Sequence, residues 1–302
     1  MRIGYPCINL SIACSSARTF RLRSYSDDRL IEIVDSNLSC LEKIMSFNEK
    51  HGIRFFRISS DLVPFASHRV CTYPWQKHFR ARFAKIGKVV KTAGARISMH
   101  PDQFVLINAK DANIFNSSVR ELLYHAEVMD LMALSTDAKI QIHVGGIYDD
   151  KEASIKRFVR RFERLPETVK RRLAIENDDR LYSVADCMKI HEMIGLPVII
   201  DSFHHELKNE GEQLSEALEM AASTWSRRDG PLMVDYSSQQ QGSRIGAHAE
   251  TIDVADFKRF LAISRPHDFD LMLEIKDKEV SAQRAMELAA GDPRFFKRDG
   301  VN

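Results

Sequence analysis

Imidazole and carboxylate side chains in this sequence stand where apolar segments end. The stretch VIIDSFHH, residues 198–205, starts with three apolar residues and then reaches Asp201 and His204. The same arrangement recurs along the chain, and the residues at or just past such ends are Asn9, His100, His143, Glu176, Asp201, His204, Asp235 and Glu274. His248 follows in a later loop. Imidazole nitrogens and carboxylate oxygens bind Mn²⁺, Zn²⁺, Fe²⁺ and Mg²⁺, so the pattern predicts a metal site if these ends meet in space.

The elements that would bring these residues together are short strands alternating with amphipathic helices. Gly52, Gly94 and Gly195 each stand between a helical stretch and the next apolar run, where a helix C-terminus favours a left-handed residue. Ser183 marks one helix start, and Ser118, three residues before a glutamate, has a capping-box pattern that predicts another. We place strands at residues 3–9, 54–59, 96–100, 139–144, 173–176, 198–201, 232–236 and 270–274.

Strands that alternate with helices pair in parallel through right-handed crossovers. Eight such units within 302 residues predict an α/β fold, a single (β/α)8 TIM barrel that forms one domain over residues 1–302. An open doubly wound sheet is the structural alternative. In a barrel the functional groups lie at the carboxyl ends of the strands, so the metal-ligand types would share one mouth.

Each of these residues also has an ordinary structural interpretation. A lone histidine at a strand end is often a loop residue bonded to backbone, Glu176 could cap a helix, and Glu274 could face solvent on a rim. Their joint occurrence favours metal, because several carboxylates in one mouth would repel one another without cations. A bridging carboxylate such as Glu176 could hold two ions about 3.5–4 Å apart, an arrangement that serves hydroxide attack on phosphodiesters. Phosphodiester hydrolysis is therefore the predicted reaction class.

Composition sets limits on partners and compartment. The formal charge is only +2, so a nucleic-acid partner would need a local basic patch. The five cysteines show no CxxC spacing, from which we expect reduced thiols and a cytoplasmic protein without a disulfide framework. The start of the chain does not read as a signal peptide, and no run approaches the ~18 apolar residues of a membrane span. We expect a monomer with no obligate protein partner.

Two loops suggest what approaches the mouth. Arg18, Arg21 and Arg23 follow the first strand with no acid until Asp27, which is typical either of a solvated loop or of contact with a phosphate backbone. Gln103 and Phe104 come directly after His100. A polar and aromatic pair in such a loop can pack locally, or it can enter a base stack beside an extruded nucleotide.

Several blocks of the sequence together resemble the ultraviolet damage endonuclease family, the DNA-repair relatives of endonuclease IV. The blocks are GYPCIN, RISSDLVPFASH, ISMHPDQF, IHVGG, AIENDD, IIDSFHH and GAHAETID, in this order over nearly the whole chain. The resemblance implies a TIM barrel with three divalent ions, commonly Mn²⁺, with Zn²⁺, Mg²⁺ or Co²⁺ as alternatives. It also implies a damaged DNA duplex as the partner and a nick immediately 5′ of ultraviolet photoproducts, such as cyclobutane dimers and 6-4 photoproducts, and of other lesions.

Carried over position by position, the resemblance makes metal ligands of His100, His143, Glu176, Asp201, His204, His248 and Glu274. It places Tyr5, Asn9 and His68 near the scissile phosphate, where we expect them to be catalytic residues together with Glu176. It makes Gln103 and Phe104 the pair that probes the lesion, where the family commonly has tyrosine in the second position.

Two departures from the family pattern lie in the stretch LMVDYSSQ. Met233 stands where relatives often carry a modifiable lysine, and Asp235 stands where they carry a histidine. Asp235 can still bind Mn²⁺ through oxygen, whereas Met233 is a poor ligand for a hard ion and cannot be carboxylated. We therefore predict no modified lysine at this position. A sugar isomerase of the xylose isomerase type and a damage-binding protein without cleavage are the competing hypotheses.

Overall fold

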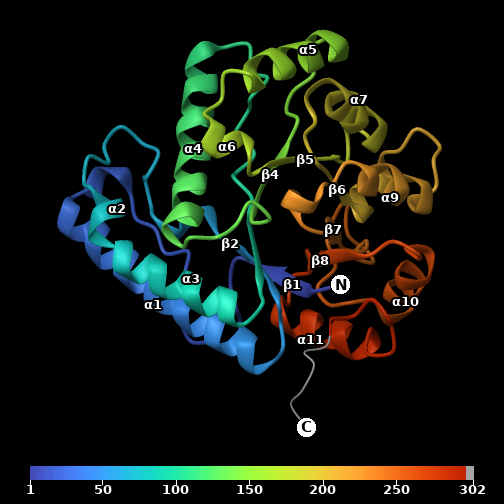
Figure 1. Ribbon diagram of the computed structural model, residues 1–302, viewed down its shortest axis with the longest axis horizontal. Coiled ribbons are helices and arrows are strands. Elements are labelled where there is room, and N and C mark those ends of the chain that lie inside the picture. The colour runs from blue at the N-terminus through green and yellow to red at the C-terminus, as the bar shows by residue number, and fades with distance from the viewer. Residues whose placement is uncertain (297–302) are drawn as a thin grey trace.

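The computed structural model describes residues 1–296 and shows a closed barrel of eight parallel strands paired in sequence order, β1 to β8, with β8 returning to β1 (Figure 1). Each strand is followed by at least one helix, and the helices surround the barrel. The strands are β1 (Ile3–Pro6), β2 (Phe55–Ile58), β3 (Arg96–Met99), β4 (Lys139–His143), β5 (Leu173–Glu176), β6 (Val198–Asp201), β7 (Leu232–Tyr236) and β8 (Phe269–Leu273). The predicted (β/α)8 barrel is confirmed, and the open sheet is excluded.

The first strand ends at Pro6, three residues earlier than predicted. β1 stops at Pro6 because Cys7 takes a positive φ of 72°, which turns the chain out of the sheet. Asn9 therefore belongs to the loop after β1. The other strands lie within about two residues of their predicted bounds.

The α-helices are α1 (Asp27–Lys50), α2 (Trp75–His78), α3 (Arg80–Thr92), α4 (Ala112–Leu131), α5 (Lys151–Phe162), α6 (Glu167–Lys170), α7 (Val184–Ile194), α8 (Ser202–Leu207), α9 (Leu214–Ser223), α10 (Val254–Ile263) and α11 (Glu279–Leu288). Short 3₁₀ turns occur at Leu22–Ser24, Ser60–Leu62 and Arg227–Asp229.

Helix boundaries test the capping predictions. Ser183 caps α7 as predicted, and Gly195 ends that helix with a left-handed φ of 70°. The prediction for Ser118 is wrong, because α4 begins earlier, where the side chain of Asp111 caps the helix. Ser118 lies inside α4, where its hydroxyl donates to Ile114 O and accepts from Leu106 N. A serine before a glutamate imitates a cap in sequence even when a nearby aspartate makes the real one.

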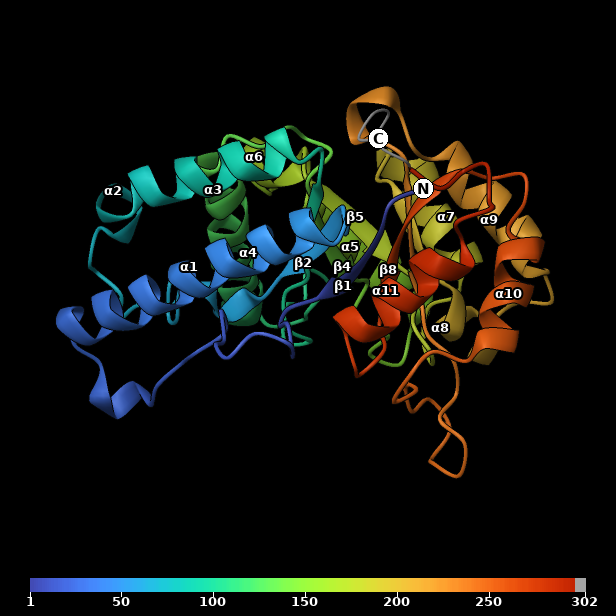
Figure 2. The same cartoon turned by 90° about the horizontal axis from the view of Figure 1, so that it is seen from below.

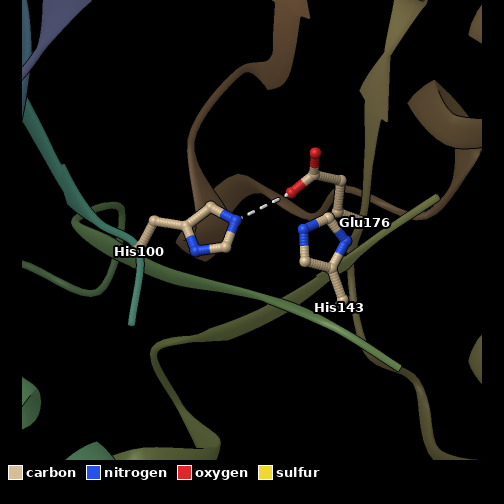
Figure 3. Close-up of side chains that lie close together, drawn as sticks. All are labelled: His100, His143 and Glu176. Carbon is tan, nitrogen blue, oxygen red and sulfur yellow. Dashed lines mark hydrogen bonds and ion pairs between the residues drawn. The ribbon is translucent and has the colours of Figure 1, made fainter. Parts of the chain in front are cut away.

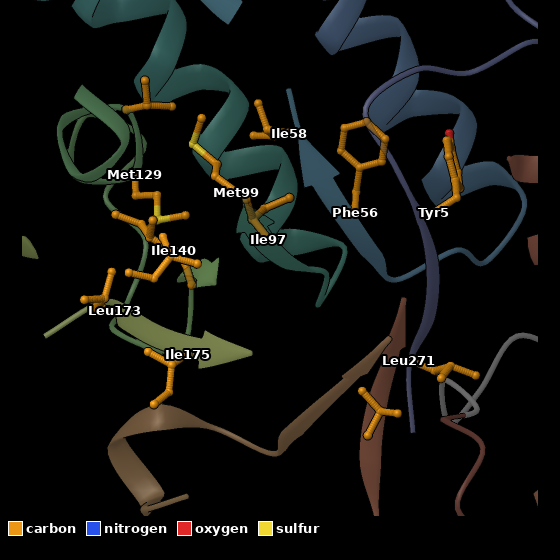
Figure 4. Packing of buried hydrophobic residues seen from close by; sticks show 14 of the residues in the cluster. Tyr5, Phe56, Ile58, Ile97, Met99, Met129, Ile140, Leu173, Ile175 and Leu271 are labelled. Atoms are coloured by element: carbon orange, nitrogen blue, oxygen red, sulfur yellow. The ribbon is translucent and has the colours of Figure 1, made fainter. Parts of the chain in front are cut away.

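The main core lies between the barrel and the helices. Outward-facing strand residues such as Phe56, Ile97, Ile140 and Ile175 are buried there (Figure 4). β1 approaches β2 so closely that a Cβ on Gly4 would lie 1.8 Å from Phe55 O. Only glycine fits at this position without a shift of β1 away from β2.

The barrel interior is built in two layers by the two-residue period of the strands. A lower layer of five buried apolar side chains contains Phe55, Ala174, Ile199, Met233 and Met272. Two residues further along the same strands stand Arg57, Glu176, Asp201, Asp235 and Glu274. Because alternate residues face the same side, this polar layer sits on the apolar one at the carboxyl end of the barrel.

Cysteine pairing differs from the expectation of reduced thiols. Cys14 and Cys40 form a disulfide with a Cα–Cα separation of 5.8 Å, which joins the loop after β1 to α1. Cys7, Cys71 and Cys187 are free. Two cysteines separated by 26 residues carry no local pairing signal, so only the fold reveals their proximity. Within residues 1–296, no helix is both long and apolar enough to cross a bilayer.

Candidate metal centre

Two groups of metal-ligand side chains meet at the carboxyl end of the barrel. His100, His143 and Glu176 form the first group, and Glu176, Asp201 and His204 form the second. Within each group the ligand atoms all lie within 4.8 Å of one another. Figure 3 shows the His100 and His143 rings on either side of the Glu176 carboxylate. The strand ends thus converge as the sequence predicted.

Glu176 belongs to both groups and turns one oxygen to each. Its Oε2 lies 3.2 Å from His100 Nε2, and its Oε1 lies 3.4 Å from His204 Nδ1. Asp201 Oδ2 is also 3.4 Å from His204 Nδ1. This arrangement is the one expected of a carboxylate that bridges two ions.

Several buried oxygen and nitrogen atoms that could bind a metal lack hydrogen-bond partners, which indicates that these residues fit a metal ion. Asp235 Oδ1 and His143 Nδ1 are buried and have no hydrogen-bond partner, and Asp201 Oδ2 is buried with no hydrogen bond beyond its 3.4 Å ion-pair contact with His204 Nδ1. Buried polar atoms are normally satisfied, so such atoms gathered at one place indicate a site that can take a ligand. All the donors are nitrogen or oxygen, which suits Mn²⁺, Zn²⁺ or Fe²⁺ and excludes a thiolate-held cluster.

The pKa shifts follow from burial and from the close charges. Burial would raise the pKa of Glu176, but His143, His100 and His204 outweigh it and hold the pKa well below its usual value. Burial raises the pKa of Asp201 above its usual value, even with His204 beside it. Burial would lower the pKa of His204, but Asp201 and Glu176 raise it to about 11. The carboxylates therefore favour a proton on His204, and divalent cations bound there would supply the compensating positive charge instead.

Arg57 occupies the centre of the polar layer and was not found from the sequence. Its guanidinium donates to Asp235 Oδ2 at 2.7 Å and to Gln141 Oε1 at 2.9 Å, and it also ion-pairs with Glu274. Gln141 in turn donates to Glu176 and Asp235. One buried cation thus links the carboxylates of two strands. Its signal in the sequence is an arginine inside the apolar strand FFRI, in register with the strand's inward face.

His248 and Glu274 lie beside these groups. His248 Nδ1 is 2.7 Å from Glu274 O, so it donates there and leaves Nε2 free as an acceptor. The Glu274 carboxylate is 4.0 Å from the same Nδ1. Burial would raise the pKa of Glu274, but Arg57 lowers it below its usual value. Glu274 is therefore a carboxylate that stays ionised.

A cavity of about 680 Å³ opens above the metal-ligand groups. Its wall includes Gln103, Arg244, Lys276 and Lys278 as well as His100, His143, Glu176, His204, His248 and Glu274. A second cavity of about 640 Å³ shares His100, Gln103, His143 and Arg244 and extends towards Gly145 and Asp178. The walls are mixed in charge: Arg244, Lys276 and Lys278 stand there with Asp102, Asp178 and Asp179, and Lys276 pairs with Glu250. Arg244 and Lys278 supply positive charge above an acidic floor, which suits a phosphate that meets cations bound at that floor.

Three residues expected near the scissile phosphate do not line either cavity. Tyr5 is fully buried, where its hydroxyl donates to Asn48 Oδ1 at 2.7 Å and accepts from Asn9 Nδ2 at 2.8 Å. Burial raises the pKa of Tyr5 well above its usual value, so it stays protonated. His68 is exposed in the loop after β2, where its Nδ1 accepts from Val70 N.

The predicted DNA-facing residues lie at the surface. Gln103 lines both cavities, and the side chain of Phe104 is 67% exposed. Arg18, Arg21 and Arg23 are exposed in the loop before α1. Arg18 is partly fixed there, because its guanidinium donates to Ser36 Oγ at 2.9 Å.

The barrel and its two metal-ligand groups define a TIM-barrel protein with a candidate metal centre at its mouth. Residues 1–293 match the family described as UV-endonuclease UvdE. The chain is 34% identical over 284 residues to the UV DNA damage endonuclease of Clostridium perfringens (strain 13 / Type A), covering 93% of this chain and 69% of the relative. It is 32% identical over 298 residues to that of Bacillus cereus (strain G9842), covering 95% and 94%. The chain belongs to the UV DNA damage endonuclease family and is an endonuclease.

One solved structure agrees with this assignment, and a second shares the fold. The crystal structure of SacUVDE superimposes with a TM-score of 0.92 at 42% identity, covering 96% of this chain and 98% of that one. The structure of an L-ribulose 3-epimerase has a TM-score of 0.57 at 16% identity and covers 100% of this chain and 89% of that one. At that identity the second likeness shows the barrel fold alone.

Proposed function

We propose that this protein is a metal-dependent endonuclease that nicks duplex DNA immediately 5′ of ultraviolet photoproducts. The observation that carries the proposal is the carboxylate of Glu176, which belongs to both metal-ligand groups at the floor of the cavity. Divalent ions held there, Mn²⁺ foremost, supply Lewis acidity that activates water and stabilises charge on a phosphodiester.

The chain's own residues divide the work of holding the ions. His100 and His143 with Glu176 would hold one ion, and Asp201 and His204 with Glu176 would hold a second. A third would draw on His248, Glu274 and the unpartnered Oδ1 of Asp235. Arg57 keeps Glu274 and Asp235 oriented while it neutralises part of their charge. The site is therefore preorganised before DNA arrives.

In this proposal Tyr5 and Asn9 contribute by positioning the loop that leaves β1. The hydrogen bond from Asn9 Nδ2 to the Tyr5 hydroxyl anchors the start of the loop that leaves β1, next to Pro6 and Cys7 in the cavity wall. His68, in the exposed loop after β2, would reach DNA from outside the cavity.

Lesion recognition is assigned to the loop after β3. Gln103 lies in the cavity wall and Phe104 projects from it, so a base pair weakened by a photoproduct could be opened and its stack filled by the ring. Arg18, Arg21 and Arg23 would contact backbone phosphates on the β1 side of the mouth.

The test is a nicking assay on an end-labelled duplex that carries one cyclobutane dimer, with an undamaged duplex as the control. With Mn²⁺ we expect one nick immediately 5′ of the dimer and none with a chelator. A duplex left intact by metal-loaded protein would contradict the proposal. Binding without cleavage would then indicate a damage-binding protein, and ketose or aldose turnover without DNA would indicate a sugar enzyme.

A further inference from the structure

The three most exposed large hydrophobic side chains within residues 1–296 all stand in loops at the mouth of the barrel. Leu10 is 56% exposed after β1, Phe104 is 67% exposed after β3, and Ile245 is 82% exposed after β7. Single exposed hydrophobic residues are common on protein surfaces. Their concentration at one rim, around the cavity that Arg244 and Lys278 line, needs a physical reason.

Ile245 is held in the solvent by a braced loop. Gln239 Oε1 accepts from Gly246 N at 2.9 Å, and Gln239 Nε2 donates to Arg244 O at 2.9 Å. The backbone adds a bond from Gln240 N to Ala247 O at 2.8 Å. The residues on both sides of Ile245 are thus held by one glutamine, so the backbone that presents the exposed side chain has a defined position.

This loop tip belongs to the mouth. Arg244 and Gly246 line both cavities, and the loop between β7 and α10 extends away from the barrel in Figure 2. In a closed barrel of eight strands in sequence order, β3 and β7 lie on opposite sides. Phe104 and Ile245 therefore rise from opposite sides of the same opening.

The loop is also joined to the candidate metal centre. Gln239 pairs with His248 in an isolated antiparallel bridge, and His248 Nδ1 bonds to Glu274 O at 2.7 Å. Gln239, which bonds to Arg244 and Gly246, therefore connects the loop tip directly to His248.

We propose that the Arg244–Ile245 tip is a second DNA-probing element. Ile245 enters the base stack from the side opposite Phe104, and Arg244 contacts a backbone phosphate. Apolar side chains are known to act as wedges between base steps, and Arg244 and Lys278 in the cavity wall favour a polyanion over an apolar protein partner. The inference rests on the proposed function, since it assigns a further contact to the same lesion-containing duplex.

The experiment uses the whole, Mn²⁺-loaded protein and a dimer-containing duplex whose linkage 5′ of the dimer is a non-hydrolysable phosphonate. A 2-aminopurine beside the lesion reports unstacking through its fluorescence. The variants are Ile245→Ala and, as the conservative replacement, Ile245→Leu. Ile263→Ala is the matched control, because Ile263 is exposed at the C-terminal end of α10 and contributes to neither cavity.

We expect Ile245→Ala to weaken binding of the damaged duplex by roughly tenfold and to reduce the fluorescence rise, with little effect on undamaged DNA. Ile245→Leu should retain both signals, and Ile263→Ala should match the original protein. Unchanged affinity and fluorescence with Ile245→Ala would overturn the inference. So would an equal loss on damaged and undamaged DNA with normal fluorescence, which indicates a backbone contact alone. Nicking of an ordinary dimer duplex by the unaltered protein tests the proposed function separately.

Discussion

Replacement of Glu176 tests the shared carboxylate most directly. Its two oxygens face different partners, with Oε2 3.2 Å from His100 Nε2 and Oε1 3.4 Å from His204 Nδ1. Glu176→Gln keeps the shape of the side chain and one oxygen, but it presents an amide nitrogen to the other metal-ligand group. Glu176→Ala removes both oxygens. The first change should therefore disable one ligand group, and the second should disable both.

The expected magnitudes follow from that geometry. Loss of one preorganised electrostatic contact to a transition state costs about 10²–10³ in rate. Glu176→Gln should thus slow nicking by about 10²–10³, and Glu176→Ala should slow it by about 10⁴ or more, because two groups fail together. Lesion binding should be largely retained, since Gln103 and Phe104 are unaltered.

The assay combines single-turnover nicking of a dimer-containing duplex with metal analysis of the purified protein. We expect at least two Mn²⁺ per chain in the original protein and fewer in each variant. Glu212→Gln is the matched control, because Glu212 is a glutamate beside a histidine, 3.5 Å from His205 Nε2, but lies outside both ligand groups. Nicking by Glu176→Ala within tenfold of the original protein, with unchanged metal content, would refute the bridging role.

Three further predictions concern other parts of the molecule. Phe104→Ala should weaken damaged-duplex binding by roughly 1–3 kcal/mol if the ring stacks on a base, whereas an unchanged dissociation constant would leave it a packing residue. Burial lowers the pKa of His125 from 6.5 to about 4, so stability should be complete above pH 6.5 and fall towards pH 4, by about 3 kcal/mol at most. Urea unfolding at pH 6.5 and pH 4 should show a smaller loss of unfolding free energy between the two pH values for His125→Gln than for the original protein. An equal loss in both proteins would contradict this. Gly4→Ala should destabilise the barrel by roughly 1–3 kcal/mol or more because its Cβ meets Phe55 O, and a melting temperature unchanged within error would disprove the steric argument.

The barrel could be predicted from the sequence because its strands are short apolar runs that end in polar residues. Glu176 and Asp201 were found in this way, at the last positions of β5 and β6. Strand ends in a parallel barrel share one face, so a one-dimensional pattern is enough to predict that such residues meet.

Arg57 shows why the rest could not be found by that route. A charged residue inside a strand is stable only if partners from other strands reach it, and these partners are Gln141, Asp235 and Glu274. The Cys14–Cys40 disulfide likewise depends on how a loop folds over α1. Both features depend on contacts between distant segments, which local patterns do not encode.

The two-layer interior of the barrel has a consequence for how this protein can change. Because the apolar floor and the polar layer alternate along the same strands, deletion of a single residue from β5, β6 or β7 would exchange inward for outward side chains. Glu176 or Asp235 would then face the helices, and an aliphatic neighbour would face the mouth. Substitutions leave this alternation intact, whereas insertions and deletions preserve it only in steps of two. Length variation in this protein should therefore be confined to its loops.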